Sequence, residues 1–306
     1  MLYESTLEAI GNTPLIRLNR ITDDTMADIY AKYEAVNIGG SIKSRTAFNM
    51  IEDAEKRGLL NENSVIVECT SGNQGIALAM IGAVKGYRVI IVMPDSVSVE
   101  RRKLISQYGA QIRLVHDEGN IGACIEKCQQ IVRNSAREDP YVFVPGQFEN
   151  PANVEAQKRT GEEIIRDLPR VDGFCSGIGT GGTLTGIASV LKERNPDTLI
   201  WAIEPENAAI LSGKEIGTHM QMGIGDGVIP AILDQEIYDH ICIITDEEAI
   251  AAAKMLAKKE GLLCGISSGT NIAAALLMAK KLGKGKNVVT VLPDTGERYY
   301  STPLFE

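Results

Sequence analysis

The chain has 306 residues, 44% of them hydrophobic and 23% charged, which fits a soluble globular protein with two lobes or one large α/β unit. Its formal net charge of -9 argues against non-specific binding to nucleic acid, because Lys and Arg side chains must neutralise phosphates in such binding. No stretch reaches the roughly 18 apolar residues that span a bilayer, and the start lacks the pattern of a signal peptide. We therefore expect a cytoplasmic protein.

Apolar, β-rich runs alternate with helix-period segments along most of the chain, as in parallel strands joined by crossover helices. The runs predicted to be strands are residues 64–69, 88–93, 111–115, 141–144, 171–176, 198–203, 241–245 and 287–292. The segments predicted to be helices are residues 74–86, 99–109, 120–134, 183–195 and 246–261. Most strand runs are almost continuously apolar, which predicts an α/β fold with helices on both faces of mostly parallel sheets.

Two local patterns mark boundaries in this alternation. Thr245 and Glu248 have the spacing of a capping box, which predicts the start of the helix at 246. Pro, Gly and Asn interrupt the alternation at residues 145–153, where we place the boundary between two lobes.

The cysteines and histidines give little support to a metal site. The six cysteines are scattered, and most lie in apolar runs, as reduced core thiols do. Cys124 and Cys128 are spaced i, i+4 on a predicted helix, but no second Cys or His pair stands nearby to complete a zinc site. We expect no metal ion.

Glycine-rich turns follow predicted strands at residues 70–75, 177–183 and 265–270. In open α/β sheets the ligands bind at the carboxyl ends of strands, and the helix after each turn offers unpaired N–H groups to an anion. The turn at 177–183 fits G-x-G-x-x-G, and Glu204 lies where a dinucleotide fold has its ribose-binding acid. By itself this turn favours a nicotinamide cofactor, although the same geometry binds a single phosphate monoester.

Two further features favour an aldehyde cofactor. Lys43 lies on a turn that opens a helix, and an aldehyde needs such an amine. A second polar glycine loop presents Thr70, Ser71 and Asn73, which provide the hydroxyl and N–H groups that an amino-acid carboxylate requires. A nicotinamide enzyme requires neither feature.

These residues lie in motifs that resemble the cysteine synthase and cystathionine β-synthase family of fold type II pyridoxal phosphate enzymes, which are similar in shape to the tryptophan synthase β subunit. The resemblance runs in family order through nearly the whole chain. The motifs are residues 10–15, 37–45, 70–75, 94–102, 147–153, 179–183, 223–230, 265–269 and 293–299.

The resemblance implies a role for each candidate residue. Lys43 is similar to the Schiff-base lysine that also moves the α-proton, Asn73 to the residue bonded to the phenolic oxygen of the cofactor, and Ser267 to the partner of its pyridine nitrogen. The implied phosphate cradle is Gly179, Thr180, Gly181, Gly182 and Thr183. The implied clamp for the substrate carboxylate is Thr70, Ser71, Gly72, Gln74 and Gln147. Taken singly, Lys43 fits a solvated surface charge, Gly72 and Gly181 fit turn formers, and Ser267 with Ser268 fits a helix N-cap.

The family's fold implies a two-domain, three-layer structure. We expect residues 1–145 to form an N-terminal lobe with the lysine and the substrate loop, and residues 146–306 a C-terminal lobe with the phosphate cradle. We also expect residues 13–34 to pack on the C-terminal lobe. The resemblance implies a homodimer, and no C-terminal regulatory module is expected after residues 293–306.

The implied reaction is β-elimination or β-replacement on serine, O-acetylserine or cysteine through an aminoacrylate, with sulfide, water or a thiol as nucleophile. A hydroxyl such as that of Ser267 cannot keep the pyridine nitrogen protonated, which weakens the electron sink and favours loss of a β-substituent. The setting is sulfur amino-acid metabolism.

Asp226 is the most informative departure from the family pattern, because sulfhydrylases often have a small residue at this position in the 223–230 motif. A carboxylate there either accepts a proton from water or repels an anionic nucleophile such as hydrosulfide. We hypothesise that Asp226 shifts the enzyme toward cysteine breakdown to hydrogen sulfide and serine. The alternative is a solvated loop acid, since Asp is common in turns.

Three other functions fit part of the sequence. A serine or threonine deaminase of the same fold releases pyruvate or 2-oxobutyrate without an added nucleophile. A nicotinamide-dependent oxidoreductase would use the turn at 177–183. A catalytically silent regulatory relative is disfavoured by Lys43, Asn73 and Ser267.

Overall fold

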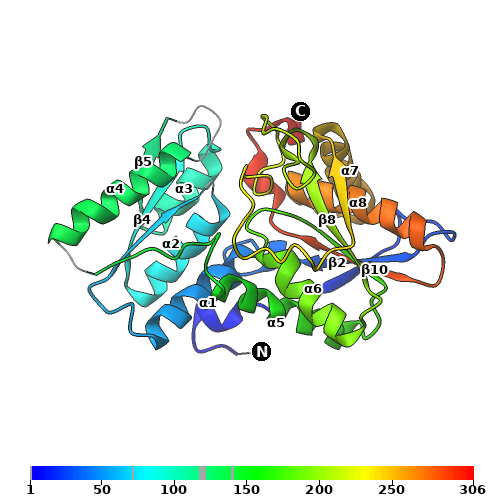
Figure 1. Ribbon diagram of the computed structural model, residues 1–306, viewed down its shortest axis with the longest axis horizontal. Helices are drawn as coiled ribbons and strands as arrows, with labels where there is room; N and C mark the ends of the chain where they lie inside the picture. The colour runs from blue at the N-terminus through cyan, green and yellow to red at the C-terminus, as the bar shows by residue number, and fades with distance from the viewer. Residues whose placement is uncertain (1, 71, 117–121, 139–140) are drawn as a thin grey trace.

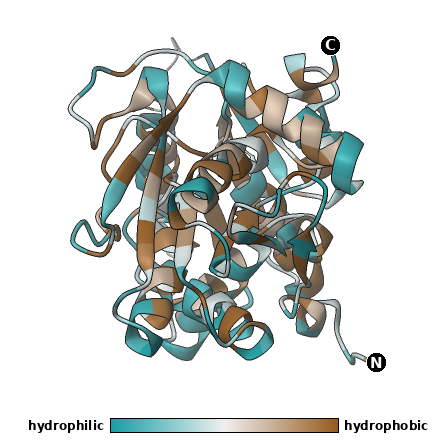
Figure 2. Cartoon of the chain, turned by 90° about the vertical axis from the view of Figure 1, so that its right-hand side faces the viewer, coloured by the Kyte–Doolittle hydropathy of each residue, from teal (hydrophilic) through white to brown (hydrophobic). Residues whose placement is uncertain are grey.

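The computed structural model describes residues 2–70, 72–116, 122–138 and 141–306. Figure 1 shows two α/β units side by side, one around a four-stranded sheet and the other around a six-stranded sheet. Within the described residues, no helix has both the length and the apolar character that a membrane crossing requires. Figure 2 shows strands coloured mainly as hydrophobic and hydrophilic residues gathered on outer helices and loops.

The four-stranded sheet is parallel and has the order β5-β4-β3-β6. Its strands are β3 (Val65–Cys69), β4 (Arg88–Pro94), β5 (Gln111–Val115) and β6 (Val142–Phe143). The helices of this unit are α1 (Lys43–Lys56), α2 (Asn73–Lys85), α3 (Val99–Gln107) and α4 (Gly122–Glu138). Val67 packs in a cluster with Cys128 of α4, whereas the next residue back, Ile66, packs with α1 and α2. Because successive strand side chains point to opposite faces, a continuous apolar run buries both faces.

The six-stranded sheet has the order β1-β2-β10-β7-β8-β9, and its pairs are parallel except β1 with β2. Its strands are β1 (Leu15–Leu18), β2 (Asp28–Tyr33), β7 (Gly173–Gly177), β8 (Leu199–Pro205), β9 (His240–Ile244) and β10 (Asn287–Leu292). The helices are α5 (Ala152–Asp167), α6 (Gly182–Arg194), α7 (Asp246–Glu260) and α8 (Ile266–Leu282). The short 3-10 helices are η1 (Thr6–Ala9), η2 (Glu34–Val36), η3 (Glu206–Ala208), η4 (Gly296–Tyr299) and η5 (Pro303–Phe305).

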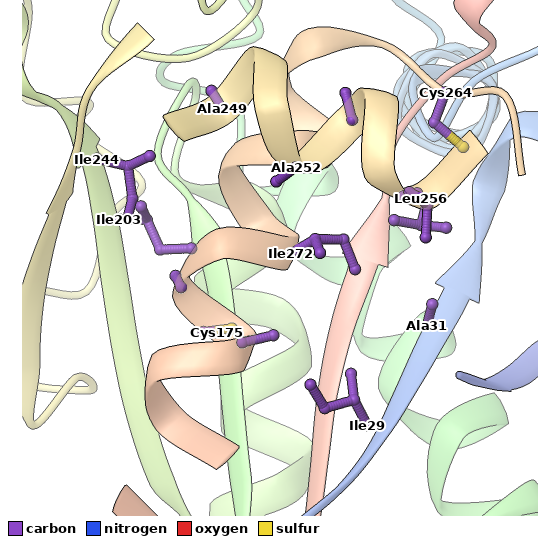
Figure 3. Packing of buried hydrophobic residues seen from close by; sticks show 14 of the residues in the cluster. Ile29, Ala31, Cys175, Ile203, Ile244, Ala249, Ala252, Leu256, Cys264 and Ile272 are labelled. Carbon is purple, nitrogen blue, oxygen red and sulfur yellow. The ribbon is translucent and has the colours of Figure 1, made fainter. Parts of the chain in front are cut away.

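Two hydrophobic layers cover this sheet. Ile29 of β2 and Ile203 of β8 belong to the cluster that includes Ile272 of α8, as Figure 3 shows. The neighbouring residue Ala202 faces the other way, into the cluster with Leu184 of α6. The sheet therefore lies between α7 and α8 on one face and α5 and α6 on the other.

The expected α/β class with mostly parallel sheets is confirmed, and every predicted strand overlaps an observed one. The capping box at the start of α7 is also present, with Thr245 accepting from the N–H of Glu248 at 3.1 Å and Glu248 accepting from the N–H of Thr245 at 2.9 Å. The sequence did not predict β1, β2 or α5 as elements, and it indicated α1 and α8 only through the turns that open them. Strand β2 carries the charged residue Lys32, so its apolar pattern is broken.

A buried network of charged side chains fixes α1 against other segments. Arg45 donates to Glu34 at 2.9 and 3.0 Å and to Glu163 of α5 at 2.6 and 2.7 Å. Lys32 donates to the carbonyl oxygen of Thr13 at 2.6 Å and pairs with Glu163 at 2.7 Å. Burial by itself raises the pKa of Glu163, but Arg45 and Lys32 outweigh it and lower the pKa from 4.5 to about 2.

Replacing Glu163 with Gln should destabilise the protein by about 3–5 kcal/mol, because Arg45 and Lys32 then keep buried charges without this carboxylate. The folded-state pKa is depressed, so the contribution of Glu163 is present above pH 4.5 and is lost as the pH falls toward about 2. Urea unfolding at several pH values should show the two proteins converging in that window. Glu155→Gln is the control, because Glu155 lies on the same helix and is 58% exposed. Equal losses in both variants would contradict the prediction.

Candidate functional site

A cavity between the two sheets brings together most of the residues singled out in the sequence. The cavity lies at the carboxyl ends of β3 and β7, where the chain continues into α2 and α6. The predicted residues that line it are Lys43, Thr70, Asn73, Gln74, Gln147, Gly179, Thr180, Gly181, Thr183, Asp226 and Ser267. Gly72 and Gly182 are next to lining residues, and Ser71 lies outside the described residues.

Lys43 is the first residue of α1 and lies partly buried in the cavity wall. The preceding turn uses Gly39 and Gly40 at φ of 82° and 71°, where side chains are disfavoured. The N–H of Ile42 donates to the carbonyl oxygen of Pro293 at 2.9 Å, which ties this turn to the chain beyond β10. Burial lowers the pKa of Lys43, against the charges of Asp226 and Asp294. This shift is toward the neutral amine, which is the form that attacks a carbonyl or accepts a proton.

Asn73, the first residue of α2, has its amide held from both ends. Its Nδ2 donates to Asp294 Oδ2 at 2.7 Å, and its Oδ1 accepts from Arg298 Nη1 at 2.6 Å. Tyr299 Oη also donates to Asp294 Oδ2, at 2.8 Å. Since a carboxylate only accepts and a guanidinium only donates, the amide cannot turn over without losing both bonds. One N–H of Nδ2 therefore remains for a ligand.

The start of α2 offers neutral donors to an anion. Its N-cap, Gly72, has no side-chain cap bond, and Thr70 Oγ1 accepts from the Gly72 N–H at 3.2 Å. Gln147 is 4% exposed, and its Nε2 donates to the carbonyl oxygen of Cys69 at 3.4 Å. The amide of Gln74 is turned toward Met50 Sδ, 3.9 Å from its Nε2, and its Oε1 has no hydrogen-bond partner in the described part of the chain.

The start of α6 is a second place for an anion. Gly181, its N-cap, has a φ of 78° and no side-chain cap bond, so the first N–H groups of the helix are available. A Cβ on Gly179 would lie 2.3 Å from the carbonyl oxygen of Gly223, and one on Gly182 would lie 2.3 Å from Asn153 Oδ1. Close packing therefore requires glycine at both positions. The hydroxyls of Thr180 and Thr183 line the same part of the cavity.

Asn153 connects both units behind this loop, although the sequence assigned it no role. Its Nδ2 donates to Thr180 Oγ1 at 3.0 Å and to the carbonyl oxygen of Gln147 at 2.9 Å. Its Oδ1 accepts from Thr46 of α1 at 3.1 Å. Asn153, Asp294 and Arg298 all lie in motifs that marked the family resemblance, so their signal was present, but their contacts were not predictable.

Ser267 is the second residue of α8 and is 4% exposed. The N-cap of this helix is Gly265, so the alternative of Ser267 as an N-cap is wrong. Within the part of the chain that the structure describes, its hydroxyl makes no hydrogen bond, which leaves it for a ligand atom in the cavity.

Asp226 lies in the loop after Gly223 and faces the same cavity as Lys43. Its Oδ2 is 3.6 Å from the position of a Cβ on Gly179. Burial raises its pKa, against the charge of Lys43. His219 Nδ1 accepts from the N–H of Gln221 at 3.1 Å, so its Nε2 carries the proton and donates to the carbonyl oxygen of Gly225 at 3.1 Å.

Glu204 does not face this cavity. Its carboxylate accepts from the N–H groups of Leu211 at 2.7 Å and Ser212 at 3.1 Å, and from Ser212 Oγ at 2.9 Å. The Glu204 carboxylate, which would bind the ribose in a dinucleotide fold, is therefore already hydrogen-bonded within the chain. Among the described residues no cluster of His, Cys, Asp and Glu could hold a metal ion.

The donor set fits a phosphorylated aromatic aldehyde. An amine with a lowered pKa, a fixed amide N–H, an unpartnered hydroxyl and an uncapped helix start with two hydroxyls surround one cavity. A second uncapped helix start, at Gly72, lies beside them for a carboxylate.

Comparisons with known proteins agree with this chemistry. The family described as pyridoxal-phosphate dependent enzyme matches residues 6–294. A cysteine synthase of Staphylococcus aureus is 46% identical over 305 residues, which are 99% of this chain and 97% of that protein. An O-ureido-L-serine synthase structure has a TM-score of 0.93 at 41% identity and covers 100% of this chain and 96% of that chain. A hydrogen sulfide-producing enzyme from Fusobacterium nucleatum has a TM-score of 0.92 at 42% identity, covering 97% of this chain and 100% of that chain.

Replacing Gly72 with Ala should destabilise the loop before α2, because the new Cβ would lie 2.3 Å from Arg101 Cδ at a φ of 152°. We expect a loss of about 1–3 kcal/mol in the free energy of unfolding, measured by urea titration. Gly86→Ala is the matched control, since Gly86 has a φ of 82° with open space around it. A smaller loss at Gly72 than at Gly86 would be inconsistent with the clash.

Proposed function

The chain belongs to the family of pyridoxal-phosphate dependent enzymes and is of the cysteine synthase type, and from this premise we propose that the cavity around Lys43 is its active site. The enzyme performs pyridoxal phosphate-dependent β-elimination or β-replacement on a small amino acid. The observation that carries the assignment of the site is the partly buried Lys43, with its lowered pKa, which lines one cavity with two uncapped helix starts.

The cofactor, when bound, supplies an electron sink that makes the α-hydrogen of the amino acid acidic and its β-substituent a leaving group. We assign its attachment and the transfer of the α-proton to Lys43 Nζ. We assign its phosphate to the cradle at the start of α6, formed by Gly179, Thr180, Gly181, Gly182 and Thr183. Asn73 Nδ2 is assigned to its phenolic oxygen and the Ser267 hydroxyl to its ring nitrogen.

The start of α2 holds the substrate carboxylate in this proposal. The backbone N–H groups after Gly72, the Thr70 hydroxyl and the Gln147 amide supply the donors, and the resemblance adds Ser71 and Gln74. These groups are neutral, so they orient the carboxylate without adding a positive charge that would lower the pKa of both Asp226 and Lys43.

We propose that each lobe is built around one of the two sheets. We assign residues 1–145 to an N-terminal lobe and residues 146–306 to a C-terminal lobe, with residues 13–34 packing on the latter. Strands β3–β6 support the first lobe, and the pairing of β2 with β10 supports the placement of residues 13–34. A homodimer stays a prediction from the resemblance, and a cytoplasmic location stays a prediction from the sequence pattern.

From the position of Asp226 we further propose that the enzyme breaks cysteine down to hydrogen sulfide and serine. Its carboxylate lies in the wall that also holds Lys43, where it can accept a proton from water. Its raised pKa makes it a stronger base than an exposed Asp. The similarity to a hydrogen sulfide-producing enzyme supports this direction.

Replacing Lys43 with Ala should abolish turnover, because no other amine lines the cavity within the described residues. Purified wild-type protein should show the visible absorption of the bound cofactor attached to an amine, and the variant should not. Arg101, which also lines the cavity, has a guanidinium group in place of an amine and cannot substitute. Normal turnover in the Ala variant, or a colourless wild type unchanged by added cofactor, would refute the assignment.

Replacing Asp226 with Asn should slow sulfide release from cysteine about 100-fold, because an amide cannot accept the proton of water. Cysteine formation from O-acetylserine and sulfide should fall less, since a repelling charge is also removed. Because burial raises the pKa of Asp226, wild-type sulfide release should increase as the pH rises through that pKa, and the variant should lack this increase. Asp234→Asn, at an exposed position, is the control. Unchanged rates of both reactions would rule out the role.

A further inference from the structure

Arg101 of α3 lies in the cavity wall as a buried cation with few partners. Its side chain is 3% exposed, and its Nε has no hydrogen-bond partner among the residues that the structure describes. Within the described residues, its hydrogen bonding is limited to Nη1 donating to Met222 Sδ at 2.8 Å. A guanidinium has five N–H donors, and burying them without oxygen acceptors is unfavourable. The arrangement therefore calls for an anion from outside the chain.

The carboxylate of Asp294, which is the ion-pair partner of Arg101, does not accept a hydrogen bond from it. Asp294 Oδ2 is 3.9 Å from Arg101 Nη2, too far for a hydrogen bond, and it already accepts from Asn73 and Tyr299. The guanidinium instead lies over the ring of Tyr299, 4.7 Å from its centroid. That contact fixes the plane of the guanidinium and leaves its N–H edge unsatisfied.

Packing also keeps Arg101 in place. A Cβ on Gly72 would lie 2.3 Å from Arg101 Cδ and 2.9 Å from its Nε, so the arginine stem lies directly against the loop before α2. Its head reaches Met222 in the loop that carries Asp226. The arginine side chain thus contacts both the loop before α2 and the loop that carries Asp226.

The other anion positions of the cavity are taken by neutral donors. The proposed phosphate and carboxylate positions use helix starts and hydroxyls, so the fixed positive charge of Arg101 serves neither. Reactions at a β-carbon bring in or release a third anion, such as hydrosulfide, a thiolate or acetate. A weakly hydrated guanidinium beside a polarisable thioether suits a sulfur anion best.

We propose that Arg101 and Met222 form the subsite for an anionic sulfur nucleophile or leaving group, hydrosulfide or a small thiolate. The inference rests on the proposed function and adds the chemical class of the second substrate or leaving group, a sulfur anion. Arg101 attracts the anion, whereas Asp226 in the same loop as Met222 repels it. The two residues together set how strongly the cavity holds sulfide against water.

The test compares three thiols of different charge as nucleophiles for O-acetylserine: mercaptoacetate, 2-mercaptoethanol and cysteamine. In the wild type, kcat/KM should decrease from the anionic to the cationic thiol. Arg101→Met, which keeps the length of the side chain without its charge, should raise the KM for mercaptoacetate and for sulfide about tenfold or more and leave that for cysteamine unchanged or lower. Arg101→Lys should keep the order of the three thiols.

Two controls separate this result from a general defect. Arg102→Met removes the neighbouring arginine, which donates to the carbonyl oxygens of Val97 and Asp95, and should leave the order and the KM values unchanged. Cofactor absorption and the KM for O-acetylserine should be unchanged in all variants. Arg101→Gln replaces the Met variant if that one does not fold.

The outcomes are distinct. A wild type without a preference by charge, or the same preference in Arg101→Met, overturns the subsite and leaves the proposed function standing. A wild type without cofactor absorption, or a Lys43→Ala variant with normal turnover, overturns the proposed function itself.

Discussion

The position of Lys43 depends on the buried network of Arg45, which lies two residues further along α1. Arg45 and Lys32 carry positive charges, Glu34 and Glu163 carry negative ones, and the bonds among them lie between 2.6 and 3.0 Å. Each charge would be costly to bury alone, so the four are stable only together. Because the members come from α1, α5 and the segment around β2, the network fixes the start of α1 relative to the six-stranded sheet.

A second group of contacts sets the chemistry at that place. Asp294 and Arg298 follow β10, and they hold Asn73 of α2 while Arg298 donates to the carbonyl oxygen of Gly39 before Lys43. The segment after β10 of the six-stranded sheet thus holds two parts of the other unit, the turn before Lys43 and the amide of Asn73. The reactive groups can face one cavity because helix starts from both units meet there, each with free N–H groups.

Burial and mutual attraction have opposite effects on the pKa values of Lys43 and Asp226. Burial lowers the pKa of Lys43 and raises that of Asp226, so both groups move toward their neutral forms, while their mutual attraction opposes the shift. Opposite shifts of this kind bring the pKa values of an amine and an acid closer together, which is how active sites prepare such groups for proton transfer. Arg101 adds a buried positive charge to the wall of the same cavity.

The sequence by itself determined the α/β class, most strands, the capping box of α7, and the family, because these depend on local apolar periodicity and on motifs contiguous in the chain. It also indicated Lys43, Asn73 and the loop at 179–183, since helix-opening turns are recognisable locally. Only the tertiary structure showed that β1 and β2 join β10, that Asp294 and Arg298 hold Asn73, and that Arg101 lies unsatisfied in the cavity. Those contacts join residues far apart in sequence, and their energies depend on burial and distance, which no local pattern encodes.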